Sequence, residues 1–518
     1  MSTSGGAGGP DGGASAVALE TVRERDREIQ LLTHIEAQLR WDQETQLPAK
    51  GVVERAEQLA TLEAIIHQRA TDPALGDALD EADAGAGAGD GVSVHDRALL
   101  REVRRAYEHR VKLPESLVTE IARQSSVNQA AWVRAREASD FALFASELER
   151  TVELILQRVA CLADETTASP YDVLLDEFEP YMKTAEVVAV FDELRPRLVA
   201  LLDGIRGSSV SIDGTVLARS YDTNTQRSFS DELLAALGFE RDRGRLDVSA
   251  HPFSTTLGPD DVRVTTRFAE NLVSSSVFGT IHECGHGLYE LGVDPALAAS
   301  ALGAGVSLGI HESQSRFWEN VVGRSRAFWE HFLPRLSAHF PQQLADQDVD
   351  SFYAAINRVE PSFIRVEADE VTYNLHILLR FTLEQQLVEG SLQVSELPEA
   401  WRALSRDLLG IDPTAAADGV LQDIHWSAFL IGYFPTYTLG NLYGAQLAAA
   451  LQRDLGELAP LLQEAQFTPI LEWLRSNIHR HGATYPAREL CERATGTSLT
   501  AAHFVTYLEN KYRALYLL

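Results

Sequence analysis

Apolar residues recur at three- and four-residue steps along most of this chain, which is the spacing of one face of an α-helix. In residues 52–70 the apolar positions at these steps are Val52, Val53, Ala56, Leu59, Leu62, Ile65 and Ile66. The same spacing predicts helices over residues 97–110, 142–165, 184–206, 368–388 and 441–454. The pattern therefore predicts a mainly α-helical protein.

Strand patterns are scarce and lie in the middle of the chain. Residues 261–266 alternate and are rich in β-branched side chains, which predicts a strand. Residues 208–217 are a candidate hairpin around Asp213-Gly214. We therefore expect a small β-sheet just before the histidine motif described below.

Two stretches of small residues stand apart from the helical pattern. Residues 1–15 are rich in Gly, Ser and Ala, which is typical of a flexible tail. Residues 83–91 alternate largely between Ala and Gly and predict a loop between helices. No internal repeat divides the remainder, so we expect a flexible tail over residues 1–16 and a single domain over residues 17–518.

Composition and charge exclude several classes of protein. The 518 residues are 45% hydrophobic and 23% charged, which is typical of soluble globular proteins. The net charge of −30 argues against nucleic-acid binding, because phosphate contacts need basic patches. The sequence has no run of about 18 apolar residues, and it starts without the basic and apolar stretches of a secretory signal. We expect a cytoplasmic protein with no nucleic-acid or membrane partner.

The chemistry of the chain concentrates in His282-Glu283-Cys284-Gly285-His286. On a helix, residues four apart lie roughly 40° apart around the axis, so His282 and His286 can hold one metal ion together. Glu283 lies about 100° from the first histidine, where it can act as a general base without being a ligand. The expected helical position of Cys284 points its thiol away from the ion. The motif therefore predicts a zinc-type metallopeptidase.

A catalytic zinc ion needs a third protein ligand and an open position. Glu312 lies in His311-Glu312-Ser313-Gln314, within residues 308–317, which can form a helix beside the first one. Its carboxylate completes a His, His, Glu set. His311 is the alternative ligand.

Several further motifs occur in the order found in one known family. They are Trp41-Asp42-Gln43-Glu44-Thr45, His251-Pro252-Phe253, Asp261-Val262-Arg263-Val264-Thr265, the two histidine motifs above, Ile364-Arg365-Val366-Glu367-Ala368-Asp369, and Gly419-Val420-Leu421-Gln422-Asp423-Ile424-His425-Trp426. Over about residues 20–518 the chain resembles the carboxypeptidase Taq family of metallocarboxypeptidases. It departs from the family at Leu47, where Met is common, and at Tyr181, where Gly is common.

The resemblance implies a mainly α, two-lobed helical fold with a deep cleft and a small β-sheet beside the active site, similar to neurolysin-like peptidases. It also implies a homodimer. The implied activity is removal of single residues from peptides with a free C-terminus, with broad specificity. One zinc ion per subunit is expected, and cobalt is possible.

Recognition of a terminal carboxylate calls for an arginine, whose guanidinium can form two parallel hydrogen bonds to it. The resemblance favours Arg365 for this role, and the alternative is an ion pair with Asp369. Arg263 is the second candidate, and its alternative is to organise the sheet with Asp261.

Other side chains are candidates for supporting roles. His425 and Tyr437 could donate hydrogen bonds to the tetrahedral intermediate, and Gln422 is a candidate for substrate contact. Asp369 is a candidate partner for the free N–H of a ligating histidine. His251 could orient the site or cap the strand turn.

Two other functions use the same residues differently. An oligopeptidase would cut internal bonds with the same metal set, and it would tolerate an amidated C-terminus. A catalytically silent peptide-binding protein is the second alternative. The intact set of His282, Glu283, His286 and Glu312 argues against silence.

Overall fold

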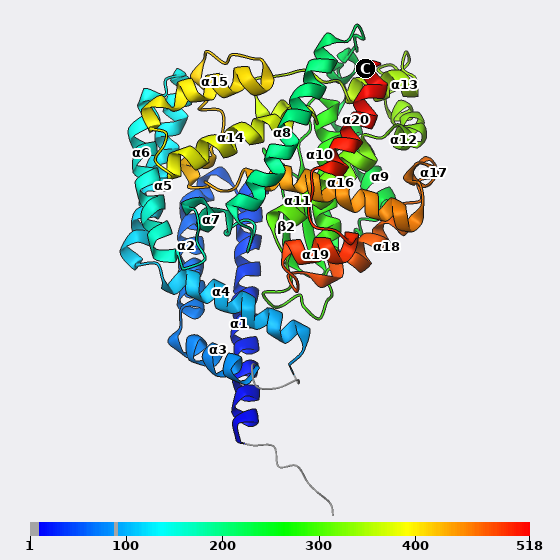
Figure 1. Cartoon of the computed structure of the whole chain (residues 1–518). Helices are drawn as coiled ribbons and strands as arrows, with labels where there is room; N and C mark the ends of the chain where they lie inside the picture. Colours follow the sequence, from blue (N-terminus) through cyan, green and yellow to red (C-terminus); the bar gives the residue numbers. More distant parts are fainter. Residues whose placement is uncertain (1–9, 87–91) are drawn as a thin grey trace, which may run out of the picture.

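Helices make up most of the structure, as the hydrophobic spacing predicts (Figure 1). The computed structural model describes residues 10–86 and 92–518. The first four helices of the chain are α1 (Pro10–Thr45), α2 (Val52–Ala70), α3 (Pro73–Ala86) and α4 (Val94–Val111). In Figure 1, α3 and α4 lie below the main body, and α1 and α2 run up into it. The long helix α1 packs against α2 and α3 and reaches the sheet at its far end.

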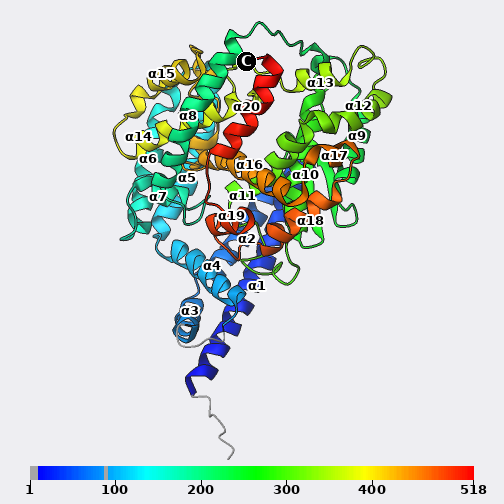
Figure 2. The same ribbon diagram turned by 45° about the vertical axis from the view of Figure 1, so that its right-hand side comes forward.

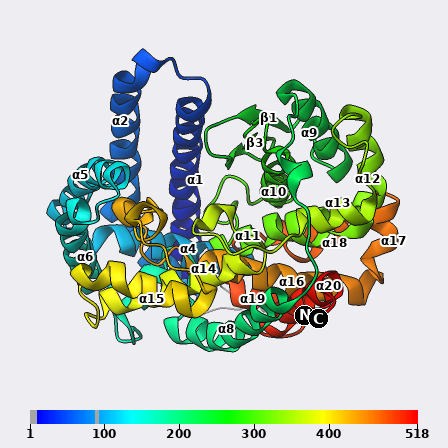
Figure 3. The same ribbon diagram turned by 90° about the horizontal axis from the view of Figure 1, so that it is seen from above.

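Two groups of helices face each other across the main body (Figure 2 and Figure 3). On one side, helices from the first half of the chain lie beside helices added much later: α5 (Glu115–Ala138), α6 (Ala142–Leu162), α7 (Pro170–Leu175), α8 (Thr184–Gly207), α14 (Thr372–Val388) and α15 (Leu397–Leu409). On the other side lie α9 (Thr223–Leu237), α12 (Arg326–His339), α13 (Val349–Ile356), α17 (Leu458–Gln463) and α18 (Thr468–Asn477). Two helices near the C-terminus, α19 (Ala487–Thr495) and α20 (Ala502–Tyr516), pack on α16 (Pro435–Leu455).

A three-stranded sheet packs against α10 (Val273–Leu291). Its strands are β1 (Gly244–Val248), β2 (Ser254–Gly258) and β3 (Asp261–Thr266), in the order β1-β3-β2. β1 runs parallel to β3, with Leu246 opposite Val264, and β2 runs antiparallel to β3. The side chains of Val262 and Val264 are fully buried, and β3 packs on α10.

Three helices meet at the centre of the molecule, where α10 and α16 both pack against α11 (Leu308–Arg316). Glycines permit this close approach. A Cβ atom at Gly285 of α10 would lie 2.6 Å from the Gln314 carbonyl oxygen, and one at Gly440 of α16 would lie 2.5 Å from Cγ of Glu312. The chain continues from α11 into a π-helix, η3 (Phe317–Gly323). Packing at the glycines therefore sets where the side chains of α11 lie.

Most of the expected elements are confirmed. The helix over residues 52–70 and the strand over 261–266 have the predicted bounds, and the other five helices form with ends displaced by a few residues. The helix expected from residue 368 begins at Thr372, because Asp369 Oδ1 accepts hydrogen bonds from the amides of Val371 and Thr372. The small sheet lies just before the histidine motif, as expected.

Three expectations need correction. The hairpin over residues 208–217 is wrong: this segment has no strand and ends in a 3-10 turn, with the Asp213 carboxylate accepting from the Thr215 amide at 2.9 Å. Of the expected tail, residues 1–9 lie outside the described residues, whereas 10–16 begin α1. Of the expected loop, 83–86 belong to α3 and 87–91 lie outside the described residues.

In the described part of the chain, no helix is long and apolar enough to span a membrane. Two short 3-10 turns carry residues that the sequence motifs single out: η4 (Arg365–Glu367) begins with Arg365, and η7 (His425–Ala428) begins with His425.

Candidate metal centre and active site

Helices α10 and α11 bring the three predicted ligand atoms together. The Nε2 atoms of His282 and His286 lie 3.6 and 3.5 Å from Oε2 of Glu312. Two metal–ligand bonds of about 2.1 Å at a tetrahedral angle place their ligand atoms about 3.4 Å apart. The observed distances therefore suit a single ion, and these three residues form the group whose ligand atoms all lie within 4.8 Å of one another.

The other nitrogen of each histidine is held by a second side chain. His282 Nδ1 lies 2.9 Å from Oε2 of Glu319, and His286 Nδ1 lies 2.6 Å from Nδ1 of His311. Both rings thus present Nε2 to Glu312. The geometry favours Glu312 over His311 as the third ligand, because His311 faces the far side of the His286 ring.

Two arginines order the carboxylates around the three ligand atoms. Arg316 Nε donates to Oε1 of Glu312 at 2.7 Å, which leaves Oε2 facing the histidines. Arg316 and Arg324 also donate to Glu319, at 3.2 and 3.1 Å. Burial by itself would raise the pKa of Glu312 and of Glu319, but the charge of Arg316 and the contacts with His282 and other neighbours together outweigh it and hold both pKa values well below their usual range.

Glu283 is the carboxylate left without a partner. Its side chain is buried beside His282, and its Oε2 has no hydrogen-bond partner among the described residues. Burial raises the pKa of Glu283 to about 7, although the neighbouring His282 charge lowers it. A buried carboxylate oxygen without a donor beside three converging ligand atoms fits a site that holds a cation and a water molecule. Cys284 is fully buried and outside the ligand group, as expected.

A second group of polar side chains is centred on Arg365, which is only 5% exposed. Its Nε and Nη2 donate to Oδ1 of Asp423 at 3.0 and 2.8 Å, and Nη1 donates to the Tyr373 hydroxyl at 3.1 Å. Asp423 also accepts from Arg380 Nε at 2.7 Å. The alternative ion pair between Arg365 and Asp369 is therefore wrong, because Asp423 takes that place.

Asp369 makes no hydrogen bond to either candidate ligand histidine. Its carboxylate accepts from the amides of Glu360, Val371 and Thr372, so it caps the start of α14. Glu319 contacts His282 instead. The sequence holds a signal for Glu319, since it lies seven residues after Glu312 and two helical turns bring such residues to one face.

The remaining predicted side chains lie around Arg365. Gln422 Oε1 accepts from the Arg365 amide at 2.8 Å, so this glutamine holds the backbone of the arginine. His425 Nε2 lies 3.4 Å from the Tyr437 hydroxyl, and the Tyr437 ring lies 5.0 Å from the Arg365 guanidinium carbon. Burial lowers the pKa of His425 to about 4, which leaves a neutral ring at physiological pH. The structure thus groups Arg365, Gln422, His425 and Tyr437.

Tyr373 joins this group to the metal-ligand group, and the sequence motifs do not single it out. It lies on α14, and the Arg316 guanidinium carbon is 4.6 Å from its ring centre. Its hydroxyl accepts from Arg365. Because Arg316 also holds Glu312, one tyrosine separates the two arginines of the candidate site.

Arg263 and His251 lie elsewhere. Arg263 makes two hydrogen bonds to Asp261, at 2.9 and 2.8 Å, and lies 4.3 Å from the ring of Trp41 on α1. The bonds to Asp261 match the alternative role of Arg263, which is to organise the sheet. The contact with Trp41 also joins the sheet to α1. The His251 side chain is exposed in the turn between β1 and β2, and its backbone carbonyl accepts from the Ser249 hydroxyl at 2.6 Å.

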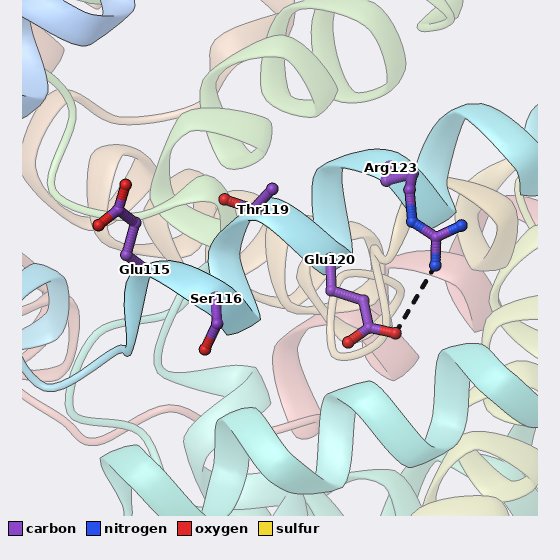
Figure 4. A pocket seen from close by; sticks show the side chains of 5 residues that line it. All are labelled: Glu115, Ser116, Thr119, Glu120 and Arg123. Carbon is purple, nitrogen blue, oxygen red and sulfur yellow. Dashed lines mark ion pairs between the residues drawn. The ribbon is translucent and has the colours of Figure 1, made fainter.

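A hollow of about 620 Å³ lies on the surface of α5 (Figure 4). One helix supplies its whole lining, which is Glu115, Ser116, Thr119, Glu120 and Arg123. Glu120 and Arg123 form an ion pair of 3.7 Å within this lining. The hollow contains no histidine or cysteine, so we assign the chemistry to the site on α10 and α11.

Comparison with known proteins identifies the family. The profile of the carboxypeptidase Taq (M32) metallopeptidases matches residues 21–512. The chain belongs to this family. Thermostable carboxypeptidase 1 of Thermus thermophilus is 45% identical over 507 residues, which cover 96% of this chain and 99% of the relative. Carboxypeptidase 1 of Bacillus subtilis is 38% identical over 482 residues, covering 93% and 95%.

Solved structures of family members have the same fold. The M32 carboxypeptidase of Deinococcus radiodurans R1 is 38% identical, has a TM-score of 0.93 and is matched over 97% of this chain and 100% of its own. A carboxypeptidase of Pyrococcus furiosus is 36% identical, with a TM-score of 0.92 and coverage of 96% and 99%. The chain is therefore a metal-dependent carboxypeptidase that acts on peptides, and its family membership implies a divalent metal ion.

Proposed function

We propose that this M32 carboxypeptidase releases single residues from free peptide C-termini with broad specificity, using one zinc ion per subunit. The observation that carries the proposal is the convergence of His282, His286 and Glu312 on one point, with the unpartnered oxygen of Glu283 beside them. Two imidazoles and one carboxylate form a common catalytic zinc set. Cobalt fits the same ligands.

When bound, the ion would polarise the scissile carbonyl and lower the pKa of a water molecule. Glu283 would accept the proton of the attacking water on a carboxylate oxygen and pass it to the leaving amine. Arg316 would hold Glu312 in place through its Oε1 atom. His425 and Tyr437 would donate hydrogen bonds to the oxyanion, and His425 would do so as a neutral imidazole.

Arg365 is the proposed partner of the substrate's terminal carboxylate. It is buried, and Arg365 and Arg380 together face the one carboxylate of Asp423. The three groups carry a net positive charge, which an incoming carboxylate would balance. Gln422 would keep Arg365 in position through its backbone amide. Arg263 is the second candidate for this role.

Digestion of matched peptides tests the proposal. Metal analysis of the purified protein should find about one zinc ion per subunit, and mass spectrometry should find a ladder of C-terminal truncations. The same peptide with an amidated C-terminus is the control and should be a poor substrate. Equal cleavage of both peptides at internal bonds would contradict the proposal and favour an oligopeptidase.

Four further proposals rest on the resemblance and the sequence pattern. We propose a deep cleft at the site, a homodimer, a cytoplasmic location and a single catalytic domain over residues 17–518. A structure with a bound peptide tests the cleft, and light scattering tests the homodimer. Cell fractionation tests the location, and limited proteolysis tests the single domain.

A further inference from the structure

The two candidate ligand histidines differ in the side chain that contacts Nδ1, the ring nitrogen that faces away from Glu312. For His282 it is a carboxylate, Glu319, at 2.9 Å. For His286 it is a second imidazole, His311, at 2.6 Å. His311 Nε2 in turn lies 2.6 Å from Oε1 of Glu290, which is one turn after His286 on α10. His286, His311 and Glu290 therefore form a continuous chain of hydrogen bonds.

The position of each proton in this chain follows from chemistry. A hydrogen bond between two imidazole nitrogens needs one N–H group and one lone pair. His286 Nε2 faces Glu312 and must offer its lone pair to bind a cation, so its proton is on Nδ1. This N–H donates to Nδ1 of His311. His311 then carries its own proton on Nε2 and donates it to the Glu290 carboxylate.

Packing holds the His311 ring in this orientation. A Cβ atom at Gly305 would lie 2.7 Å from Cδ2 of His311, so the backbone at this glycine lies against the ring. The centre of the Tyr289 ring lies 5.2 Å from the centre of the His311 ring. The chain of hydrogen bonds thus connects α10 and α11.

We propose that His311 is a positioning residue: with Glu290 it fixes the tautomer and ring orientation of His286, and it does not bind the ion. The proposal rests on the proposed function in one respect, that His286 is a metal ligand. Groups that hold a ligating histidine in this way contribute about 10- to 100-fold to metal affinity in other proteins.

Zinc binding to the metal-free protein measures this contribution without using activity. With a chelating competitor, His311→Ala should raise the Kd for Zn²⁺ by about 10- to 100-fold. His311→Asn should recover part of the loss, because its amide oxygen can accept the His286 N–H. Glu290→Gln should have a smaller effect, since it keeps an acceptor for His311. His339→Ala is the matched control. His339 is also a histidine paired with a carboxylate, Glu232, at 3.1 Å, but it is not part of the ligand group.

A spectroscopic signature separates positioning from a general loss of structure. In the Co²⁺-loaded protein, each coordinated histidine should give one exchangeable N–H proton signal that the metal shifts strongly. Wild type should show two such signals. In His311→Ala the His286 signal should be lost to solvent exchange, while the His282 signal, protected by Glu319, should remain as an internal control.

The outcomes are distinct. A third histidine signal in wild type that His311→Ala removes would make His311 a ligand and overturn the proposal. An unchanged Kd and unchanged signals in His311→Ala, with tight zinc binding by wild type, would also overturn it and leave the proposed function standing. Wild-type protein that binds no zinc would refute the proposed function, and the positioning role with it.

Discussion

Replacing Arg365 by alanine should lower kcat/KM on peptides with a free C-terminus far more than on amidated peptides. The variant removes the buried guanidinium and its bonds to Asp423 and Tyr373. Asp423 keeps its second partner, because Arg380 Nε still donates to it at 2.7 Å. No carboxylate is left unpaired, so we expect the fold and the metal content to survive.

The expected magnitude follows from the burial of Arg365. A desolvated charged contact of this kind is worth about 2–5 kcal/mol, which corresponds to about 30- to 5,000-fold in kcat/KM. Asp423 already occupies two donors of the guanidinium. We therefore expect the middle of that range, about 100- to 1,000-fold. Arg365→Lys should recover only part, because an ammonium group cannot form two parallel bonds to a carboxylate.

The assay compares matched free and amidated peptides with wild type and variants, together with zinc content and thermal unfolding. Arg263→Ala is the comparison variant, because Arg263, the second candidate, is also a carboxylate-paired arginine stacked on an aromatic ring. It should change the ratio of free to amidated kcat/KM little. A ratio that stays the same in Arg365→Ala would refute the reasoning, and a ratio that falls in Arg263→Ala would move the role to Arg263.

Three further predictions concern other parts of the structure. Glu283→Gln should keep its zinc by metal analysis yet lose about 10²- to 10⁴-fold in kcat, because a general base is lost and not a ligand; loss of zinc would contradict this. Gly285→Ala should weaken zinc binding and lower the free energy of unfolding by about 1–3 kcal/mol, because its Cβ would lie 2.6 Å from the Gln314 carbonyl oxygen. Gly207→Ala is its control, having no atom within 4 Å of an added Cβ, and equal effects would refute the packing argument. Asp26 is buried, and burial raises its pKa to about 6 from 3.8, so the folded state binds this proton more tightly than the unfolded state. Its contribution to stability is therefore complete below pH 3.8 and lost as the pH rises through 6. Asp26→Asn should unfold at higher urea concentration than wild type at pH 8, with the difference shrinking toward pH 4, and a difference independent of pH would contradict the assignment.

Local patterns in the sequence were enough for the helices and for the core of the metal-ligand group. His282 and His286 share a face because α-helical geometry places residues four apart together, whatever surrounds the helix. The same holds for the apolar face of α2 and for the alternation of β3. The position of Glu312 one helix after the histidine pair was enough to predict it, and the family resemblance brought Arg365 into the candidate site. The hairpin over residues 208–217 failed because its turn residues are equally compatible with the 3-10 turn that forms.

The partners of these side chains depended on the tertiary structure. Arg365 lies four residues before Asp369, but its partner is Asp423, which is 58 residues away and reaches it only because η4 and α14 pack beside the segment before η7. The geometry that favours Glu312 over His311 as the candidate third ligand also depends on how α10 packs on α11, because His311 lies against Nδ1 of His286 and not against Nε2. Tyr373 of α14 meets Arg316 of α11 and Arg365 of η4 only because the tertiary structure brings these elements together. Backbone geometry determines which side chains share a helix face, whereas contacts between helices depend on how closely their surfaces pack, and that is a property of the whole fold.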